Sequence, residues 1–192
     1  MFRTDLLKGK RILVTGGGTG LGKSIARRYC ELGAEVVICG RRTDVLDAAA
    51  TEMREATGAS VETQGCDLRD SGAVEAMMAK IWDKAPLDVL VNNAAANFIA
   101  RTESLSPRAV DAVLNIVLLG SFYCTLGAGR RWIEAGTSCC WASTALPRSW
   151  VHSSLSLIMV IVCGKATSDC TLTSQFLPSA ALTAASPFIS GL

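Results

Sequence analysis

The sequence predicts an α/β protein built on a doubly wound parallel sheet. Short apolar strands and amphipathic helices alternate four times before residue 136, with short connections between them. The first strand, 11–15, is a continuous apolar run, which is typical of a strand buried on both faces. Right-handed crossovers would place helices on both sides of such a sheet. The alternation stops after residue 136, so we expect the sheet to be incomplete on its C-terminal side.

The individual elements follow from apolar periodicity and from helix-end signals. Strands are expected at 11–15, 35–39, 60–64 and 87–91. Helices are expected at 20–32, 44–56, 71–83 and from 106 to about 135. Gly33 and Gly58 suit helix ends, and Thr43 suits the cap of the second helix. Pro107 suits the first turn of the last helix.

Composition divides the chain into residues 1–136 and an atypical tail, 137–192. Of 19 Lys and Arg and 17 Asp and Glu, only Arg148, Lys165 and Asp169 follow residue 136. Folded surfaces normally carry more charge, so we expect the tail to be partly packed or disordered. Its apolar run 155–163 is too short to span a bilayer and suits a buried strand.

Charge and cysteine content exclude several kinds of partner. The net charge of +2 indicates neither a nucleic acid nor an anionic membrane. The first ten residues contain no apolar run of the secretory type, so we expect a cytoplasmic protein. No C-x-x-C spacing occurs among the eight cysteines, and Cys30, Cys39, Cys66 and Cys124 have core-type neighbours. Reduced, buried thiols are expected, with no metal site.

The strongest functional signal is the stretch RILVTGGGTGLGKSIA, from Arg11 to Ala26. An apolar strand leads into glycines, and the glycines lead into a helix. Glycines allow a tight turn close to phosphates, and the helix N-terminus offers free N–H groups. This order predicts a Rossmann-type dinucleotide site. The cofactor contacts expected from the turn are Thr15, Gly16, Gly17, Gly18, Thr19, Gly20, Leu21 and Gly22.

Polar residues also follow the other three predicted strands, at the edge where parallel sheets bind ligands. Arg41 and Arg42 stand where NAD-specific domains carry an acid, and a basic pair suits a 2′-phosphate. NADP(H) is therefore the expected cofactor; the alternative is a solvated basic pair. Asp67 suits the adenine amino group and Asn93 the ribose, although both are also ordinary turn residues. Their neighbours Leu68 and Ala94 are included in the predicted cofactor site.

Three of these motifs resemble those of short-chain dehydrogenases/reductases. Residues 15–22, TGGGTGLG, match the family's T-G-x-x-x-G-x-G turn, and residues 92–95, NNAA, resemble its N-N-A-G motif. Asp67 matches the aspartate that follows the third strand in the family. The resemblance covers residues from about 8 to 136.

Further segments are similar to the NADPH-dependent 2,4-dienoyl-CoA reductase branch of that family. They are NNAAANF at 92–98, E-x-L-S-P at 103–107 and I-V-L-x-G at 116–120. The resemblance implies coenzyme A contacts at Arg41, Arg69, Phe98 and Ser106, and places Asn97 at the reacting dienoyl group. It also implies hydride transfer from NADPH to an acyl thioester, and a homotetramer whose assembly is doubtful with this tail. Position 117 is valine, where most of the wider family has an asparagine and this branch does not.

The second half of the family's site is not recognisable. The family uses a tyrosine and a lysine after the fifth strand, but Tyr29 and Tyr123 lie elsewhere in the chain. Lys165 lies close to the expected distance and is a candidate catalytic residue, although its neighbours do not match. A catalytically impaired nucleotide-binding fragment is therefore one alternative. A generic 3-oxoacyl-thioester reductase is another, against which Asn97, Phe98 and Val117 count.

We hypothesise a shift of reading frame near residues 136–138. Cysteine and tryptophan codons are restricted, and residues 139–141, CCW, read from the third base of each codon give two leucines. Residues 150–157, read the same way, permit G-x-Q-F-V-V-P, which resembles a segment of the reductase branch. A divergent but genuine tail is the alternative.

Overall fold

The structure is a computed structural model that describes residues 3–96, 101–136, 138–145 and 157–164, the last two ranges by their backbone. The strands are β1 (Arg11–Thr15), β2 (Glu35–Gly40), β3 (Val61–Gly65), β4 (Val89–Asn92), β5 (Ser138–Ala145) and β6 (Leu157–Gly164). The helices are α1 (Gly20–Glu31), α2 (Thr43–Thr57), α3 (Ser71–Lys84), α4 (Pro107–Leu114) and α5 (Gly120–Glu134), with a 3-10 turn η1 (Thr102–Ser104) and a π-helical turn η2 (Asn115–Leu119). Every strand and helix expected before residue 136 is present.

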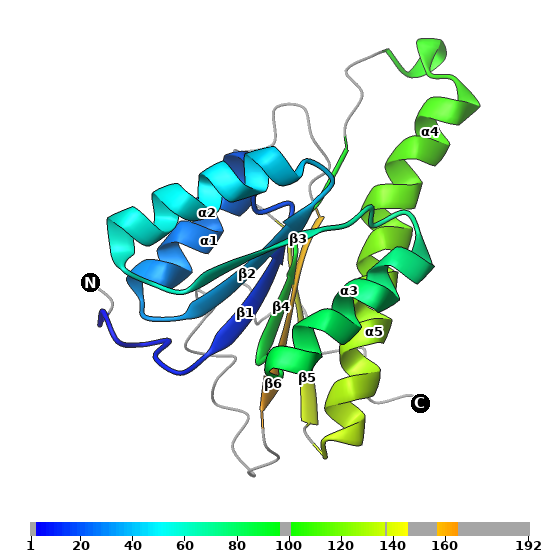
Figure 1. The fold of residues 1–192 in the computed structure, drawn as a ribbon. Coiled ribbons are helices and arrows are strands. Elements are labelled where there is room, and N and C mark those ends of the chain that lie inside the picture. Colours follow the sequence, from blue (N-terminus) through cyan, green and yellow to red (C-terminus); the bar gives the residue numbers. More distant parts are fainter. Residues whose placement is uncertain (1–2, 97–100, 137, 146–156, 165–192) are drawn as a thin grey trace.

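The six strands form one sheet in the order β3-β2-β1-β4-β6-β5. Strands β1 to β4 are parallel to one another, as predicted. Helices α1 and α2 cover one face, and α3 and α5 cover the other (Figure 1). Alternate residues of β1 enter the two cores: Ile12 packs on the α1–α2 side and Leu13 on the α3–α5 side. Burial on both faces explains why the three central residues of this strand are all apolar.

Local signals position the helix ends, with one correction. Gly58 ends α2 in the left-handed conformation at φ 68°, and Ser106 caps α4 ahead of Pro107. Thr43 does not cap α2, because the helix already includes it and Arg42 occupies the cap position. A cap that the sequence analysis did not predict is Asp70, whose carboxylate accepts bonds from the N–H groups of Gly72 and Ala73 at the start of α3.

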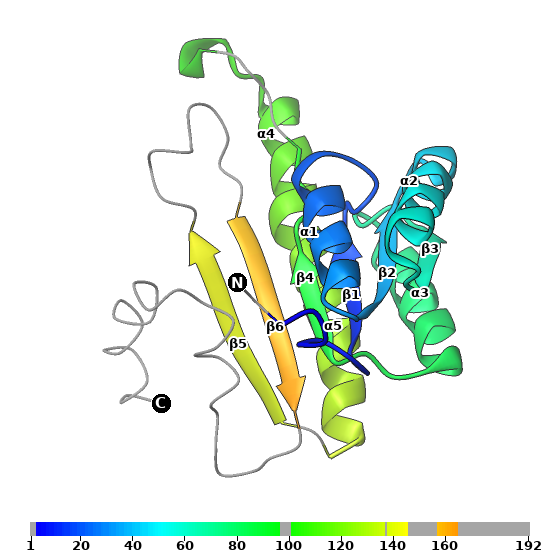
Figure 2. The same ribbon diagram turned by 90° about the vertical axis from the view of Figure 1, so that its left-hand side faces the viewer.

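The tail contributes an antiparallel hairpin rather than further parallel strands. Strand β6 runs antiparallel to β4, with Asn92 opposite Met159, and β5 pairs with the far side of β6 (Figure 2). The expected strand at 155–163 is therefore present, but its direction departs from an all-parallel sheet. The long helix α4–η2–α5 crosses from β4 to β5, but β6, which pairs antiparallel with β5, takes the position beside β4.

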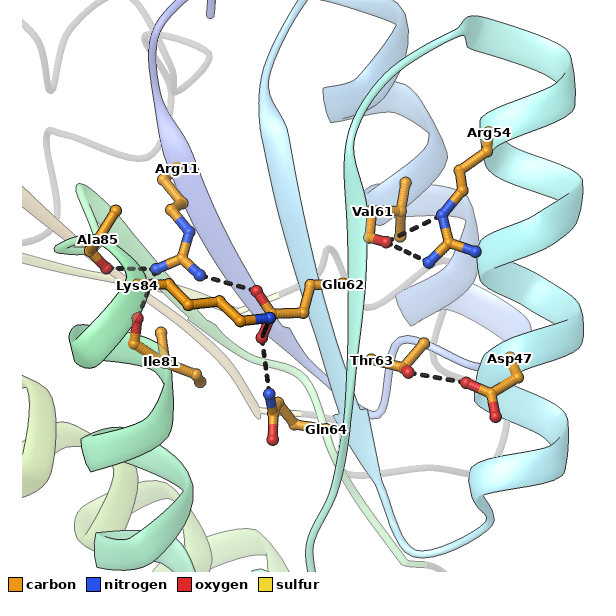
Figure 3. Close-up of polar contacts among 10 residues, drawn as sticks. All are labelled: Arg11, Asp47, Arg54, Val61, Glu62, Thr63, Gln64, Ile81, Lys84 and Ala85. Carbon is orange, nitrogen blue, oxygen red and sulfur yellow. Dashed lines mark hydrogen bonds and ion pairs between the residues drawn. The ribbon is translucent and has the colours of Figure 1, made fainter.

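A buried arginine joins the amino end of the sheet to α3 (Figure 3). Arg11 is only 7% exposed, and its guanidinium lies 2.9 Å from the Glu62 carboxylate of β3. The same guanidinium donates to the carbonyl oxygens of Ile81, at 2.8 Å, and Ala85 at the end of α3. Lys84 is also paired with Glu62, at 3.0 Å. This cluster fixes the sheet edge opposite the predicted ligand site.

Helices α4, η2 and α5 form one continuous helix whose outer side is apolar. Its exposed large hydrophobic residues are Val110, Leu114, Leu118, Leu119, Phe122, Leu126 and Ile133. By length and composition alone, the segment Pro107–Glu134 could cross a membrane, although single helices from soluble proteins meet the same criterion. The face has no partner among the described residues.

Candidate functional site

A cavity of about 340 Å³ opens at the carboxyl ends of β1, β2, β3 and β4. It is lined by Gly16, Gly18, Thr19, Leu21, Gly22, Cys39, Gly40, Arg41, Arg42, Val45, Leu46, Cys66, Leu68, Asn93, Ala94, Ala95 and Ile116. The glycine turn, the basic pair and the Asn93 turn are thus brought together, as the topology predicted. Thr15, Gly17, Gly20 and Asp67 lie beside lining residues but are not part of the cavity wall.

The glycine turn is closely packed, and the N–H groups at the start of α1 that follow it have no side-chain cap. A Cβ atom on Gly22 would lie 2.3 Å from the Gly16 carbonyl oxygen, so only glycine fits here. Gly20 has a φ of 53°, which disfavours other residues. Thr19 precedes α1 in an extended conformation, and its side chain makes no capping bond. The first N–H groups of α1 are therefore available to an anion.

Hydrogen bonds of Thr15 and Asn93 join the turn after β1 to the turn after β4. The Thr15 hydroxyl accepts bonds from the N–H groups of Asn93, at 2.9 Å, and Ala94, at 3.0 Å. In return, the Asn93 side-chain amide donates to the Thr15 carbonyl oxygen at 2.9 Å. The buried Asn92 side chain donates to the Thr125 hydroxyl at 3.2 Å and so ties β4 to α5. These bonds hold the two phosphate-side turns in a fixed relation before any ligand binds.

The basic pair and Asp67 lie on the other side of the cavity. Arg41 and Arg42 are exposed residues of its wall, directly after β2. The Asp67 carboxylate is held by the guanidinium of Arg69, with Nε at 2.9 Å from Oδ1 and Nη2 at 2.5 Å from Oδ2. These bonds, together with the weaker field of Arg41, lower the pKa of Asp67. Leu68 is buried and faces the cavity.

The residues expected to contact substrate are only partly assembled. Asn97, Phe98 and Lys165 lie outside the described residues. Gly164, which precedes Lys165, lies at the sheet edge opposite the cavity, because β6 runs antiparallel to β4. Ser106 is exposed, and its hydroxyl accepts the Ala109 N–H at 3.2 Å as the cap of α4.

Neither tyrosine of the chain is placed for catalysis. Tyr29 packs against the α1–α2 core, and burial raises the pKa of its phenol. Tyr123 packs against the α3–α5 core. Neither side chain lines the cavity. The described part of the chain therefore holds a nucleotide-type pocket without a tyrosine beside it.

Several wall residues were not singled out from the sequence. They are Cys39, Gly40, Val45, Leu46, Cys66, Ala95 and Ile116. Most follow a strand or open α2, so the rule that ligands bind at strand carboxyl ends could have identified them. Val45 and Leu46 give the wall an apolar surface suited to a flat base. Burial raises the pKa of Cys66 to about 11, so its thiol is neutral near pH 7. Cys30, Cys39, Cys66 and Cys124 are free and buried, as expected.

A family model described as short chain dehydrogenase matches residues 10–138. "Probable 2,4-dienoyl-CoA reductase 3" of Caenorhabditis elegans is 40% identical over 86% of this chain and 54% of its own length. "Probable 2,4-dienoyl-CoA reductase" of Bacillus subtilis is 38% identical over 65% of this chain and 49% of its own length. The chain thus spans about half the length of these curated relatives. Residues 1–136 make up less than three quarters of the 192 residues, whereas the C. elegans alignment covers 86% of the chain. That alignment therefore extends into the tail.

Solved structures give the same result for the fold. A metagenomic short-chain oxidoreductase in complex with NADP superposes with a TM-score of 0.63 and 32% identity, over 68% of this chain and 59% of that chain. A citronellol catabolism dehydrogenase of Pseudomonas aeruginosa superposes with a TM-score of 0.64 and 34% identity, over 68% and 54% of the two chains.

Proposed function

Because the chain belongs to the short-chain dehydrogenase family, we propose that it carries the NADP(H)-binding half of an acyl-CoA oxidoreductase. The observation that carries this proposal is the cavity bounded by the glycine turn, Arg41 and Arg42. The relatives named as 2,4-dienoyl-CoA reductases support the same substrate class here. The family's tyrosine and lysine pattern is not recognisable in the sequence, which supports binding without efficient turnover.

Each part of the cavity suits one part of the dinucleotide. The N–H groups at the start of α1 would bind the pyrophosphate, and Arg41 and Arg42 would bind the 2′-phosphate. Asp67 would accept a bond from the adenine amino group, while Asn93 would hold the ribose side of the turn. The bound nicotinamide supplies hydride chemistry, and the chain's own residues orient it.

The test of cofactor choice is a fluorescence titration with NADPH and NADH. We expect NADPH to bind at least about tenfold more tightly, as a charge-assisted phosphate contact requires. Arg41→Ala together with Arg42→Ala should remove this preference and leave NADH binding unchanged. Arg27→Ala serves as the control, since Arg27 is an exposed arginine of α1 that does not line the cavity. Equal wild-type affinities for the two cofactors would refute NADP(H) specificity.

For the substrate, we propose 2,4-dienoyl-CoA or a related acyl thioester, with Asn97 at the reacting group and Arg41, Phe98 and Ser106 on the coenzyme A. We expect no NADPH oxidation with 2,4-hexadienoyl-CoA, measured by absorbance at 340 nm. Robust turnover would show that Lys165 or another residue replaces the missing groups. Oxidation with a 3-oxoacyl thioester, but not with the dienoyl thioester, would favour a generic 3-oxoacyl reductase.

Two further proposals concern the tail and the assembly. A frameshift in the tail predicts that one inserted or deleted base restores a family-like sequence. The coding DNA across residues 130–165 tests this. The exposed apolar side of α4–α5 favours self-association with a second copy of the chain, as in the tetramer that the resemblance implies. Light scattering of the purified chain would show a monomer if this is wrong. The proposed location of the protein is the cytoplasm.

A further inference from the structure

The turn between β3 and α3, residues 66–70, is fixed to its surroundings by its backbone and by one apolar side chain. The Cys66 N–H donates to the Gly40 carbonyl oxygen at 2.8 Å, which ties the turn to the end of β2. Leu68 packs against Gly120 so closely that a Cβ there would lie 3.1 Å from the Leu68 Cβ. Asp70 caps α3 and donates its N–H to the Asp67 carbonyl oxygen at 3.1 Å. The Cα position of Asp67 is therefore determined by its neighbours.

None of these anchors acts on the Asp67 side chain. Cys66 and Leu68, on either side of it, line the cavity, so Asp67 lies next to the cavity wall. It is 34% exposed, and two rotatable bonds would let it turn into solvent. A carboxylate that must meet an amino group on a bound base needs a further contact to fix its direction.

Arg69 supplies that contact. Its backbone N–H donates to Oδ1 at 3.1 Å, and its Nε donates to the same oxygen at 2.9 Å. Nε also donates to Oδ2 at 3.1 Å, and Nη2 donates to Oδ2 at 2.5 Å. Oδ1 is thus occupied by two donors, while a carboxylate has about four acceptor positions in all. The single Nε–H is shared by both oxygens, so three N–H hydrogens meet the carboxylate and about one acceptor position remains for a further donor.

We propose that Arg69 is a positioning residue for the adenine end of the cofactor, acting through Asp67. The inference rests on the proposed NADP(H) function. It differs from the direct coenzyme A contact that the family resemblance implies for Arg69. The guanidinium holds the carboxylate in one orientation, and the remaining acceptor position of the carboxylate accepts a bond from the 6-amino group of adenine. Arg41 also faces Asp67, but it makes no hydrogen bond to the carboxylate among the contacts found in the described residues.

The test compares NADPH with its deamino analogue, in which hypoxanthine replaces adenine. The two nucleotides share their phosphates and their nicotinamide fluorescence. They differ at position 6 of the base, where adenine carries the amino group that would donate to Asp67. Wild-type protein should bind NADPH about tenfold more tightly than the analogue, as expected for a hydrogen bond to a charged group. Arg69→Ala should reduce this ratio to about twofold or less. Arg69→Lys should give an intermediate ratio, because lysine keeps the positive charge but lacks the planar guanidinium that bonds both carboxylate oxygens.

Two controls separate positioning from general effects. Arg28→Ala removes a similar exposed ion pair, to Glu31 at 2.7 Å, from α1, and should keep the wild-type ratio. Asp67→Asn should lose the ratio by itself, and adding Arg69→Ala to it should change nothing further. Coenzyme A binding is measured in parallel for each variant.

The outcomes distinguish this inference from the proposed function. A wild-type ratio near one, with tight binding of both nucleotides, would overturn the inference and leave the cofactor site intact. The inference also fails if Arg69→Ala weakens both nucleotides equally, or weakens only coenzyme A, while the ratio stays at its wild-type value. Wild-type protein that binds neither nucleotide would overturn the proposed function and this inference together.

Discussion

Replacing Gly22 by alanine should damage both the fold and the cofactor site. The added Cβ would lie 2.3 Å from the Gly16 carbonyl oxygen and 2.4 Å from the Asn93 side-chain nitrogen. Relief of these contacts requires the glycine turn to move by roughly 1 Å, an overpacking that costs about 1–3 kcal/mol. Loss of the bond from Asn93 to Thr15 adds about 1 kcal/mol. The better helix propensity of alanine offsets about the same amount.

The expected result is therefore a net loss of about 1–3 kcal/mol in the free energy of unfolding, since the last two effects cancel. NADPH affinity should fall more than tenfold, because the displaced turn carries the N–H groups for the pyrophosphate. Urea unfolding followed by circular dichroism measures the first quantity, and NADPH fluorescence titration measures the second.

Gly129→Ala provides a matched control within another helix. No atom lies within 4 Å of a Cβ built on Gly129, so alanine should stabilise α5 by up to about 1 kcal/mol and leave NADPH binding unchanged. A Gly22→Ala variant that unfolds and binds like the wild type would show that the turn adapts freely, and would refute the argument from close packing.

Three further predictions concern other parts of the molecule. Arg11→Met should lower the free energy of unfolding by about 2–3 kcal/mol, measured by urea titration. The loss is smaller than for a buried carboxylate left without any partner, because Glu62 still forms its ion pair with Lys84. An unchanged unfolding midpoint would contradict a structural role of Arg11. Burial raises the pKa of Cys124 from 9.0 to about 12, so the unfolded chain ionises first and stability should fall as pH rises through that window. Cys124→Ala should make this alkaline loss smaller, and an equal loss in both proteins would exclude the thiol as its source. Phe122→Glu should reduce the mass found by light scattering to that of a monomer, because it places a charge on the exposed apolar side of α5.

Local sequence was sufficient for the parallel half of the fold. Strand β1 is apolar at its three central positions, Ile12 to Val14, because both faces are covered, so this run was recognisable without knowledge of its neighbours. The glycine turn was predictable for a similar reason: Gly20 and Gly22 reflect backbone geometry and close approach within the turn itself.

Contacts between distant segments were not predictable from residue patterns. Arg11 looks like an ordinary charged residue before a strand, and only the arrangement of β1, β3 and α3 reveals its buried role. The direction of β6 was missed because an apolar run carries no information about its orientation. Arg69 was assigned by resemblance to substrate, while its bonds to Asp67 depend on the geometry of one turn.

The antiparallel seam between β4 and β6 bears on how the tail tolerates mutation. Strands pair through backbone N–H and carbonyl groups, which every residue except proline supplies alike. A tail that shields β4 in this way can exchange most side chains for others that favour extended backbone. Saturation mutagenesis should therefore find proline disfavoured in β6, whereas the glycine turn should tolerate almost no substitution at Gly22.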